Sequence, residues 1–224
     1  MKKYIHDHLA VPAVTESDLS FFTDAMYLEF EERFRGSPDE IRERQRKYVP
    51  FVASSAGGRK VVDIGCGTGE WLDLSKEHGF DVLGIDTNLA AVERCRQAGH
   101  TVTHLDAISF LKSTHPGALG AITMFQVVEH LKLSDLFDVL RYARTALGPG
   151  GLFLAEFPNI TVPSVGASTF WLDPTHGRPL HPEFVQFLAQ QAGFELVEIH
   201  HPSLMGSPSG TPGESLDVVV MAWA

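Results

Sequence analysis

Residues 61–71 read VVDIGCGTGEW, a largely apolar run that is followed by glycine at positions 65, 67 and 69. Glycine adopts backbone angles that are closed to other residues, and it lets the main chain approach a ligand closely. The pattern predicts a buried strand, a tight turn against a ligand, and a helix that begins near Gly69.

On both sides of this turn, the chain is expected to alternate between strands and helices. The predicted strands cover residues 60–64, 80–85, 101–105, 121–127, 152–157, 194–199 and 216–223. The predicted helices of this part cover residues 69–78, 89–98, 133–147 and 182–192. A loop rich in Pro, Gly and Ser at residues 201–214 stands where a last helix would connect, so the final strand should be antiparallel to its neighbour. The expected fold class is α/β: a Rossmann-like, seven-stranded, mostly parallel sheet with helices on both faces.

The N-terminal part is expected to form a helical lid. Apolar residues recur at helical spacing in residues 18–34, and Ser37-Pro38-Asp39-Glu40 matches a helix start with a capping box. That second helix should end near Tyr48, with a small-residue linker at residues 54–58. We predict a lid over residues 1–56 and a ligand-binding core over residues 57–224.

The next predicted strand ends in Asp86, 21 positions after Gly65. A carboxylate there can accept hydrogen bonds from both ribose hydroxyls of an adenosine. A dinucleotide fingerprint requires its third glycine at position 70, where this chain has Glu70, so a nicotinamide-dependent oxidoreductase is disfavoured. Asp63, just ahead of the turn, suits an ammonium group, met directly or through water. S-adenosylmethionine carries both an amino group and a sulfonium, and we expect it as the cofactor.

On these residues the chain resembles class I S-adenosylmethionine-dependent methyltransferases over about residues 57–224. The resemblance implies that Asp86 binds the ribose, that Asp106 binds the adenine amine, and that Gln126 lies beside the sulfonium. Helix capping by Asp106 and a strand-end hydrogen bond by Gln126 are the structural alternatives. The predicted cofactor-binding set is Asp63, Gly65, Cys66, Gly67, Gly69, Asp86, Thr87, Asp106, Ala107, Gln126, Tyr27 and Arg35.

Two residues of this set come from the predicted lid. Arg35 can hold the methionine carboxylate, and a surface position is equally open. Tyr27 can face the sulfonium, because aromatic faces attract cations. Packing with Phe30 and Phe34 inside the lid is the alternative for Tyr27.

Three stretches carry a narrower resemblance. Residues 29–51, 126–131 and 169–187 resemble bacterial methyltransferases of surface-polysaccharide assembly, in particular the methyltransferase domains of kinase–methyltransferases that terminate O-antigen chains. No kinase is expected here, because the sequence stops at Ala224. The resemblance implies O-methylation of a surface glycan, with a sugar hydroxyl and a phosphate equally open. Methylation of another small molecule, or a non-catalytic cofactor-binding scaffold, are the alternatives.

The non-periodic residues 158–182 are expected to bind the acceptor, because long loops of this kind are often lids or binding loops. This stretch also follows a parallel strand, so it emerges on the ligand side of the sheet. Asp173, Arg178 and His181 are predicted to bind substrate, and Arg178 can grip a phosphate bidentately. His176 and His130 are predicted to act on a hydroxyl as bases. A loop-stapling hydrogen bond for His176 and a helix-start contact for His130 are the alternatives.

Composition limits the partners. The chain has 18 Lys+Arg against 28 Asp+Glu, a formal net charge of −10, which disfavours a nucleic acid or an anionic membrane as the main partner. No apolar run approaches the about 20 residues of a membrane span, and no signal peptide is expected. Cys66 and Cys95 lack the spacing of a metal knuckle, and no metal is expected. We expect a cytoplasmic protein that acts on a small molecule or glycan, with homo-oligomers or a glycan-assembly complex left open.

Overall fold

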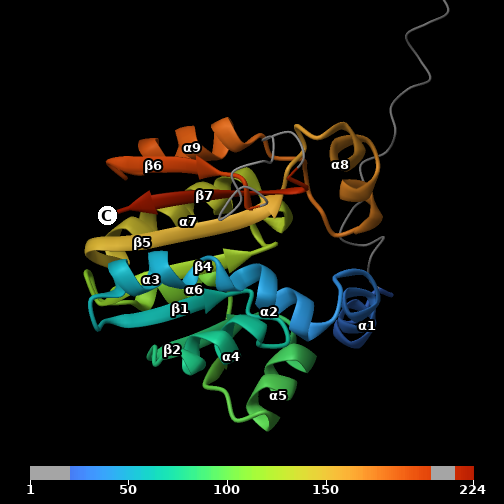
Figure 1. Cartoon of the computed structure of the whole chain (residues 1–224), viewed down its shortest axis with the longest axis horizontal. Coiled ribbons are helices and arrows are strands. Elements are labelled where there is room, and N and C mark those ends of the chain that lie inside the picture. The colour runs from blue at the N-terminus through green and yellow to red at the C-terminus, as the bar shows by residue number, and fades with distance from the viewer. Residues whose placement is uncertain (1–20, 203–214) are drawn as a thin grey trace, which may run out of the picture.

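The computed structural model describes residues 21–202 and 215–224, which are arranged around a seven-stranded sheet (Figure 1). Residues 1–20 of the predicted lid and residues 203–214 of the predicted loop lie outside the described part. The strand order in the sheet is β3-β2-β1-β4-β5-β7-β6. The strands are β1 Lys60–Ile64, β2 Val82–Asp86, β3 Val102–His104, β4 Leu119–Phe125, β5 Leu147–Pro158, β6 Leu196–His200 and β7 Asp217–Trp223.

The direction of the strands confirms the predicted fold class. β7 is antiparallel to β5 and to β6, and the remaining neighbours are parallel. In the parallel part, the carboxyl ends of β1, β2 and β4 lie at the same edge of the sheet, which is where ligands bind in folds of this type.

Helices cover both faces of the sheet, as predicted. The helices are α1 Asp24–Phe34, α2 Pro38–Arg46, α3 Val49–Ala56, α4 Glu70–Glu77, α5 Leu89–Gln97, α6 Ala107–Ser113, α7 Leu133–Ala146, α8 Pro163–Ala167 and α9 Pro182–Gln191, and the 3-10 turns are η2 Val128–His130 and η3 Thr169–Leu172. α6, α7 and α9 pack on one face through a large apolar cluster, and α3, α4 and α5 pack on the other face through a second cluster.

Adjacent strand residues belong to different clusters. Val62 and Ile122 point into the cluster of α7, whereas Val61 and Ala121 point into the cluster of α3. Side chains alternate across a strand, so a continuous apolar run supplies both faces of a sheet that is covered on both sides.

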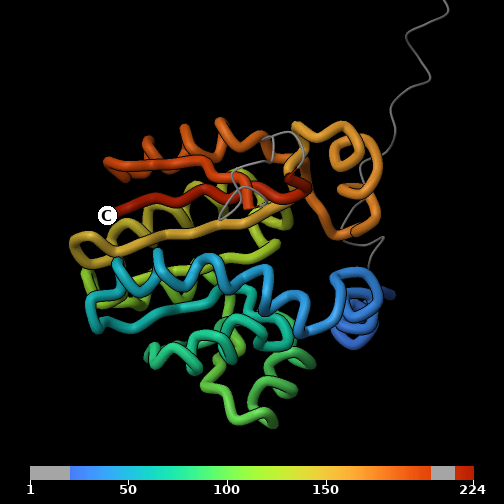
Figure 2. The backbone as a smooth tube through the Cα atoms, viewed as in Figure 1, coloured from blue at the N-terminus to red at the C-terminus, as the bar shows by residue number. Residues whose placement is uncertain are grey.

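Both N-terminal helices begin with a side-chain cap, and the cap of α2 was predicted. Ser37 and Glu40 form the predicted capping box at the start of α2. Thr23 caps α1 by accepting a hydrogen bond from the N–H of Met26 at 3.3 Å. α1 lies beyond the carboxyl edge of the sheet, at the same end of the molecule as α8 (Figures 1 and 2). No residue of α1 is buried.

Three helices were not expected from the sequence. Pro50 stands in the first turn of α3 instead of ending the preceding helix, and residues 54–56 complete α3 instead of forming a linker. α6 has one buried residue, Leu111, so it carries little periodic signal. α8 and η3 lie within residues 158–182, which were expected to be irregular.

In the ranges that the structure covers, no helix combines the length and the apolar character that crossing a membrane requires.

Candidate functional site

The turn between β1 and α4 places glycines where side chains would be strained or would clash. Gly65, Gly67 and Gly69 have φ angles of +73°, +49° and +95°. A Cβ atom on Gly65 would lie 2.3 Å from Cγ2 of Val127, and one on Gly67 would lie 3.2 Å from Nη1 of Arg35. The main chain at Gly65 and Gly67 lines a cavity. Absence of a side chain therefore lets the backbone face that space directly.

Asp86, the last residue of β2, fixes the turn from the side. Its Oδ2 accepts a hydrogen bond from the N–H of Gly67 at 2.8 Å, and its Oδ1 accepts one from the N–H of Asn88 at 2.8 Å. Burial raises the pKa of the Asp86 carboxyl, and these backbone hydrogen bonds oppose the rise. A carboxylate has about four lone-pair sites, so acceptor capacity remains for ligand hydroxyls.

The cavity beside the turn has a volume of about 370 Å³. Nine of the predicted cofactor-binding residues line it together, namely Gly65, Gly67, Asp86, Thr87, Asp106, Ala107, Gln126, Tyr27 and Arg35. The structure thus brings most of the set to one place, and the individual contacts with a cofactor stay predictions.

The other three predicted residues do not line the cavity: Asp63 lies on β1, and Cys66 and Gly69 lie in the turn. The carboxylate of Asp63 is buried and accepts a hydrogen bond from Oγ1 of Thr123 at 2.7 Å. Burial raises the pKa of Asp63 to about 8, against the opposing effect of the Thr123 hydrogen bond. Cys66 is buried, and a Cβ atom on Gly69 would lie 3.1 Å from Sγ of Cys95. None of the three lines the cavity, so the structure places them as supports of the turn, with Asp63 held in the sheet by its neighbour on β4.

Asp106 and Gln126 combine the two interpretations that the sequence left open. Oδ1 of Asp106 caps α6 by accepting a hydrogen bond from the N–H of Ser109 at 2.8 Å. Nε2 of Gln126 donates to Oδ1 of Asp217 at 3.1 Å, and Gln126 has a φ angle of +57°. Both residues also line the cavity. Asp106 and Gln126 therefore make structural hydrogen bonds and at the same time line the cavity.

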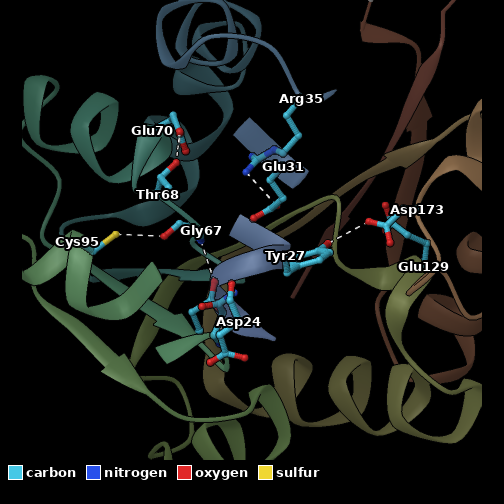
Figure 3. A network of polar contacts seen from close by, with 12 residues as sticks. Asp24, Tyr27, Glu31, Arg35, Gly67, Thr68, Glu70, Cys95, Glu129 and Asp173 are labelled. Atoms are coloured by element: carbon cyan, nitrogen blue, oxygen red, sulfur yellow. Dashed lines mark hydrogen bonds and ion pairs between the residues drawn. The ribbon is translucent and has the colours of Figure 1, made fainter. Parts of the chain in front are cut away.

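α1 contributes one face to the cavity. Tyr27, Glu31 and Arg35 are spaced four residues apart, so they lie on the same side of the helix. Arg35 donates to Oε1 of Glu31 at 3.2 Å, and the hydroxyl of Tyr27 donates to Oδ2 of Asp173 at 3.1 Å (Figure 3). At the other end of α1, Oδ2 of Asp24 accepts a hydrogen bond from the N–H of Leu89 at 2.8 Å. α1 is therefore tied both to α5 and to the stretch after β5.

Glu31 was missed by the sequence analysis. Burial raises its pKa to about 7, and the charge of Arg35 opposes that rise. The regular spacing from Tyr27 to Arg35 is the signal that could have identified it, because the residue midway between two residues of one helix face shares that face.

A second cavity of about 350 Å³ adjoins the first. Residues common to both are Tyr27, Glu31, Arg35, Phe125, Gln126 and His130. Aromatic side chains of Phe30, Phe34 and Phe170 form part of its remaining wall. A volume of this size suits a small organic molecule, so the second cavity is the candidate acceptor cavity.

The predicted acceptor residues divide into two groups. Asp173 and His176 line the acceptor cavity, whereas Arg178 and His181 line neither cavity. His181 caps α9 instead, since its Nδ1 accepts a hydrogen bond from the N–H of Glu183 at 3.3 Å. Arg178 is exposed. These two positions lie next to the start of α9, and the predicted substrate contacts of Arg178 and His181 stay predictions.

The two predicted catalytic histidines lie together. Their ring centroids are 4.8 Å apart. Nδ1 of His176 lies 2.6 Å from the carbonyl oxygen of Phe170, which is the stapling contact left open for this residue. Nδ1 of His130 lies 2.9 Å from Oγ1 of Thr175. Burial, followed by the charge of His176, lowers the pKa of His130 to about 4.

Glu129 stands beside these histidines and was given no role by the sequence analysis. It is fully buried, and within the described residues neither of its carboxylate oxygens has a hydrogen-bond partner. Nε2 of His176 lies 3.9 Å from its Oε1. Burial raises the pKa of Glu129 to about 8. Figure 3 shows Glu129 next to Asp173, near the end of the Tyr27 side chain.

A further acidic pair belongs to the acceptor cavity and was also missed. Glu156 and Asp217 lie on the antiparallel strands β5 and β7 and both line the cavity. The hydroxyl of Tyr48 donates a hydrogen bond to Oε2 of Glu156. Burial, and next the charge of Asp217, raises the pKa of Glu156 to about 7.

The first cavity fits S-adenosylmethionine in its donor and acceptor groups. Backbone approach is possible at Gly65 and Gly67, the Asp86 carboxylate suits ribose hydroxyls, and the Arg35 guanidinium suits a carboxylate.

Comparisons with known proteins agree with this site. A sequence model of a methyltransferase domain matches residues 36–199. The "Probable S-adenosylmethionine-dependent methyltransferase" of Mycolicibacterium smegmatis is 33% identical over 153 residues, which are 66% of this chain and 56% of that protein. The ubiquinone biosynthesis O-methyltransferase of Methylococcus capsulatus is 33% identical over 103 residues, which are 44% of this chain and 43% of that protein. The chain spans about half the length of these curated relatives.

Solved structures show the same fold. A crystal structure of an S-adenosylmethionine-dependent methyltransferase from Archaeoglobus fulgidus has a TM-score of 0.76 at 30% identity, over 88% of this chain and 99% of that chain. The CcbJ methyltransferase of Streptomyces caelestis has a TM-score of 0.63 at 20% identity, over 80% and 88% of the two chains, and supports the fold alone. The family match includes the glycine turn, Asp86 and both histidines of the acceptor cavity. The chain therefore belongs to the family of methyltransferase domains, and over most of its length it is similar to an S-adenosylmethionine-dependent methyltransferase.

Proposed function

We propose that this protein transfers a methyl group to a hydroxyl oxygen of a small acceptor. The observation that carries the proposal is the adjacency of the two cavities, with Gln126 and His130 in the walls of both. An acceptor atom in the second cavity can then approach a methyl group that is presented from the first. The relatives named as O-methyltransferases support oxygen as the atom that is methylated.

S-adenosylmethionine supplies a methyl group that is already activated by a sulfonium, so its transfer is an in-line displacement. The protein has to align the acceptor oxygen and exclude water. Tyr27 of α1 lines both cavities, and Phe30 and Phe170 line the acceptor cavity. We propose that residues 21–36 act as a lid in this way.

A hydroxyl acceptor has to lose its proton as the new carbon–oxygen bond forms. We assign the proton acceptor to Nε2 of His176. Nδ1 of this ring lies against the Phe170 carbonyl, which cannot donate, so Nδ1 carries the ring proton and Nε2 carries the lone pair. His176 lines the acceptor cavity, and Asp173 Oδ2 lies 3.9 Å from its Nε2.

The narrower hypothesis of a surface-glycan acceptor stays a prediction. Asp173 and His176 support a polyhydroxylated acceptor, because they offer oriented polar groups in the cavity. Arg178, the predicted phosphate contact, lies outside the cavity, and Arg35 and Arg44 are the arginines that line it. The relatives from Methylococcus capsulatus and Acinetobacter baumannii are named for ubiquinone biosynthesis, and their names lend the polysaccharide hypothesis no support.

The test is methyl incorporation from labelled cofactor into a panel of phenols, sugars and sugar phosphates, with amines as the contrasting class. His176→Ala should lower turnover at least about 100-fold, the scale for loss of a general base. Affinity for adenosylhomocysteine and the melting temperature should be retained. Arg178→Ala, in the same loop but outside both cavities, is the matched control and should behave as the parent. Methylation of amines alone, or full activity in His176→Ala, would overturn the proposal.

A further inference from the structure

Glu129, His130 and His176 offer one oxygen and two nitrogen atoms that all lie within 4.8 Å of one another. Metal–ligand bonds of about 2.1 Å place neighbouring ligand atoms about 3–4 Å apart. Nε2 of His176 and Oε1 of Glu129 are already 3.9 Å apart, and Oδ2 of Asp173 is also 3.9 Å from that nitrogen. A small rotation of side chains is sufficient to bring the three groups onto one ion.

The histidines are oriented in the manner of metal ligands. The Phe170 carbonyl accepts from Nδ1 of His176 and thereby holds Nε2 unprotonated toward the cluster. Oγ1 of Thr175 donates to Oδ1 of Asp173 and contacts Nδ1 of His130. The contact at Nδ1 holds the His130 ring in place. Hydrogen bonds to the nitrogen that does not bind metal are usual at metal-binding histidines, because they fix the tautomer and the ring orientation.

Glu129 is the independent observation that points to a ligand. Its side chain is fully buried, and both carboxylate oxygens are without a hydrogen bond in the described part of the chain. A buried carboxylate is costly unless it is paired or coordinates a metal. Nε2 of His176 lies 3.9 Å from its Oε1, which is too far for a hydrogen bond. The other charges that act on this carboxyl are the acidic groups of Asp217, Asp173 and Glu156. A cation between Glu129 and His176 satisfies both.

From this geometry we infer that Glu129, His130 and His176 bind a divalent transition-metal ion at the junction of the two cavities. A set of two imidazoles and one carboxylate suits Mn²⁺, Fe²⁺ or Zn²⁺ better than Mg²⁺ or Ca²⁺. No metal was expected from the spacing of the two cysteines. The ligands proposed here are not cysteines: they come from η2 and from the stretch after β5, and His130 and His176 are 46 positions apart in the sequence.

The position of the ion gives it a chemical role, which rests on the proposed hydroxyl acceptor. Three protein ligands leave coordination positions open on the cavity side, where an acceptor oxygen can bind. A divalent ion lowers the pKa of a bound hydroxyl, so the oxygen–hydrogen bond breaks with release of the proton to water and the oxygen keeps its electron pair. With the ion bound, Nε2 of His176 is a ligand, and its assignment above as the proton acceptor applies to the metal-free protein.

The test measures metal binding without cofactor or acceptor. The full chain is stripped with EDTA, dialysed and titrated with MnCl₂ and with ZnCl₂ by calorimetry. We expect one ion per chain. Glu129→Gln and His176→Ala should each weaken the affinity at least about tenfold. Glu70→Gln, at a buried carboxyl of α4 that lines neither cavity, is the matched control and should leave the affinity unchanged. Electron spin-echo spectra of the Mn²⁺ complex should show ¹⁴N coupling from two imidazoles, which is reduced to that of the single ligand His130 in His176→Ala.

Glu129→Gln removes an unpaired buried carboxyl, so this variant should fold with an unchanged or raised melting temperature. Equal affinity in the parent and in both ligand variants, or no binding at millimolar metal, would overturn the metal site. Methyl transfer that persists in EDTA would overturn the role of the ion in the reaction and would leave the proposed function standing, with His176 as the proton acceptor. Metal binding at the cluster together with failure of every hydroxyl acceptor would contradict the proposed function and leave the site standing.

Discussion

At the scale of single residues, the position within a strand separates two carboxylates that were both predicted to bind the cofactor. Asp63 lies one residue before the end of β1 and is hydrogen-bonded to Thr123 inside the sheet. Asp86 is the last residue of β2 and lines the cofactor cavity. Side chains of a strand alternate between faces, so a one-residue difference at the strand end decides between support of the turn and access to the ligand.

The first prediction concerns Asp63 and pH. Its pKa is raised to about 8 from an ordinary 3.8, so the folded protein keeps a proton that the unfolded chain releases above about pH 4. The free energy of unfolding should therefore fall as the pH rises from about 4 to 8, by at most about 1.4 kcal/mol per pH unit from this group. Asp63→Asn removes the titration and keeps an oxygen for the Thr123 hydroxyl. Urea titrations at several pH values should show that the free energy of unfolding depends less steeply on pH in Asp63→Asn than in the parent. Equal slopes in the two proteins would contradict the prediction.

The second prediction concerns Asp86. Asp86→Ala should weaken adenosylhomocysteine binding by about 1–3 kcal/mol, the scale for losing a charge-assisted hydrogen bond. Calorimetry measures this effect. The melting temperature has to be compared as well, because Gly67 and Asn88 donate to the same carboxylate. Asp81→Ala, an exposed carboxylate just before β2, is the control and should bind as the parent does. Unchanged affinity in Asp86→Ala would show that the ribose lies elsewhere.

At the scale of elements, the strands and the amphipathic helices were predictable, and the short helices were not. α7 has a long apolar face, and β1 and β4 are continuous apolar runs, so their signal is strong. α6 is seven residues long and α8 five, which is too short for a periodic pattern to emerge. Pro50 was ambiguous, because proline both ends one helix and suits the first turn of the next.

The third prediction concerns α1. Deleting residues 1–36 should leave a folded protein, because no residue of α1 is buried. The deletion removes the cavity wall formed by Tyr27, Glu31 and Arg35. Adenosylhomocysteine affinity should fall more than about tenfold, the value of one hydrogen bond to a charged group. Deleting residues 1–50 is the contrasting variant, and it should not fold, since it also removes the fully buried Tyr48. Normal affinity after the shorter deletion would exclude a lid function for α1.

At the scale of the whole molecule, parallel topology made the cofactor side predictable. Strand ends at one edge bring the glycine turn, Asp86 and Gln126 together, and the order of elements is sufficient to expect this. The acceptor side depends on contacts between distant segments, such as Tyr27 with Asp173, 146 positions apart. No local pattern reports such contacts. Glu129 was therefore overlooked, and Arg178 was expected in a cavity that it does not line.

The last prediction tests how firmly the N-terminal helices are joined to the sheet. Gly120 of β4 has a φ angle outside the left-handed region, so a side chain there meets no backbone strain. A Cβ atom would nevertheless lie 2.3 Å from the carbonyl oxygen of Ala56 and 2.6 Å from its Cα, which are backbone atoms at the end of α3. Gly120→Ala should lower the free energy of unfolding by about 1–3 kcal/mol, the range for overpacking.

Chemical denaturation measures this loss, with Gly177→Ala as the control, because its new Cβ would have only an ordinary contact at 3.5 Å to the carbonyl oxygen of Glu129. α3 leads through α2 to α1, so a displaced α3 should also weaken adenosylhomocysteine binding in Gly120→Ala. Loss of stability and affinity together would favour a lid boundary near Gly36, with α3 belonging to the core. Unchanged stability would mean that α3 shifts freely on the sheet, which is the behaviour expected if the lid extended to residue 56.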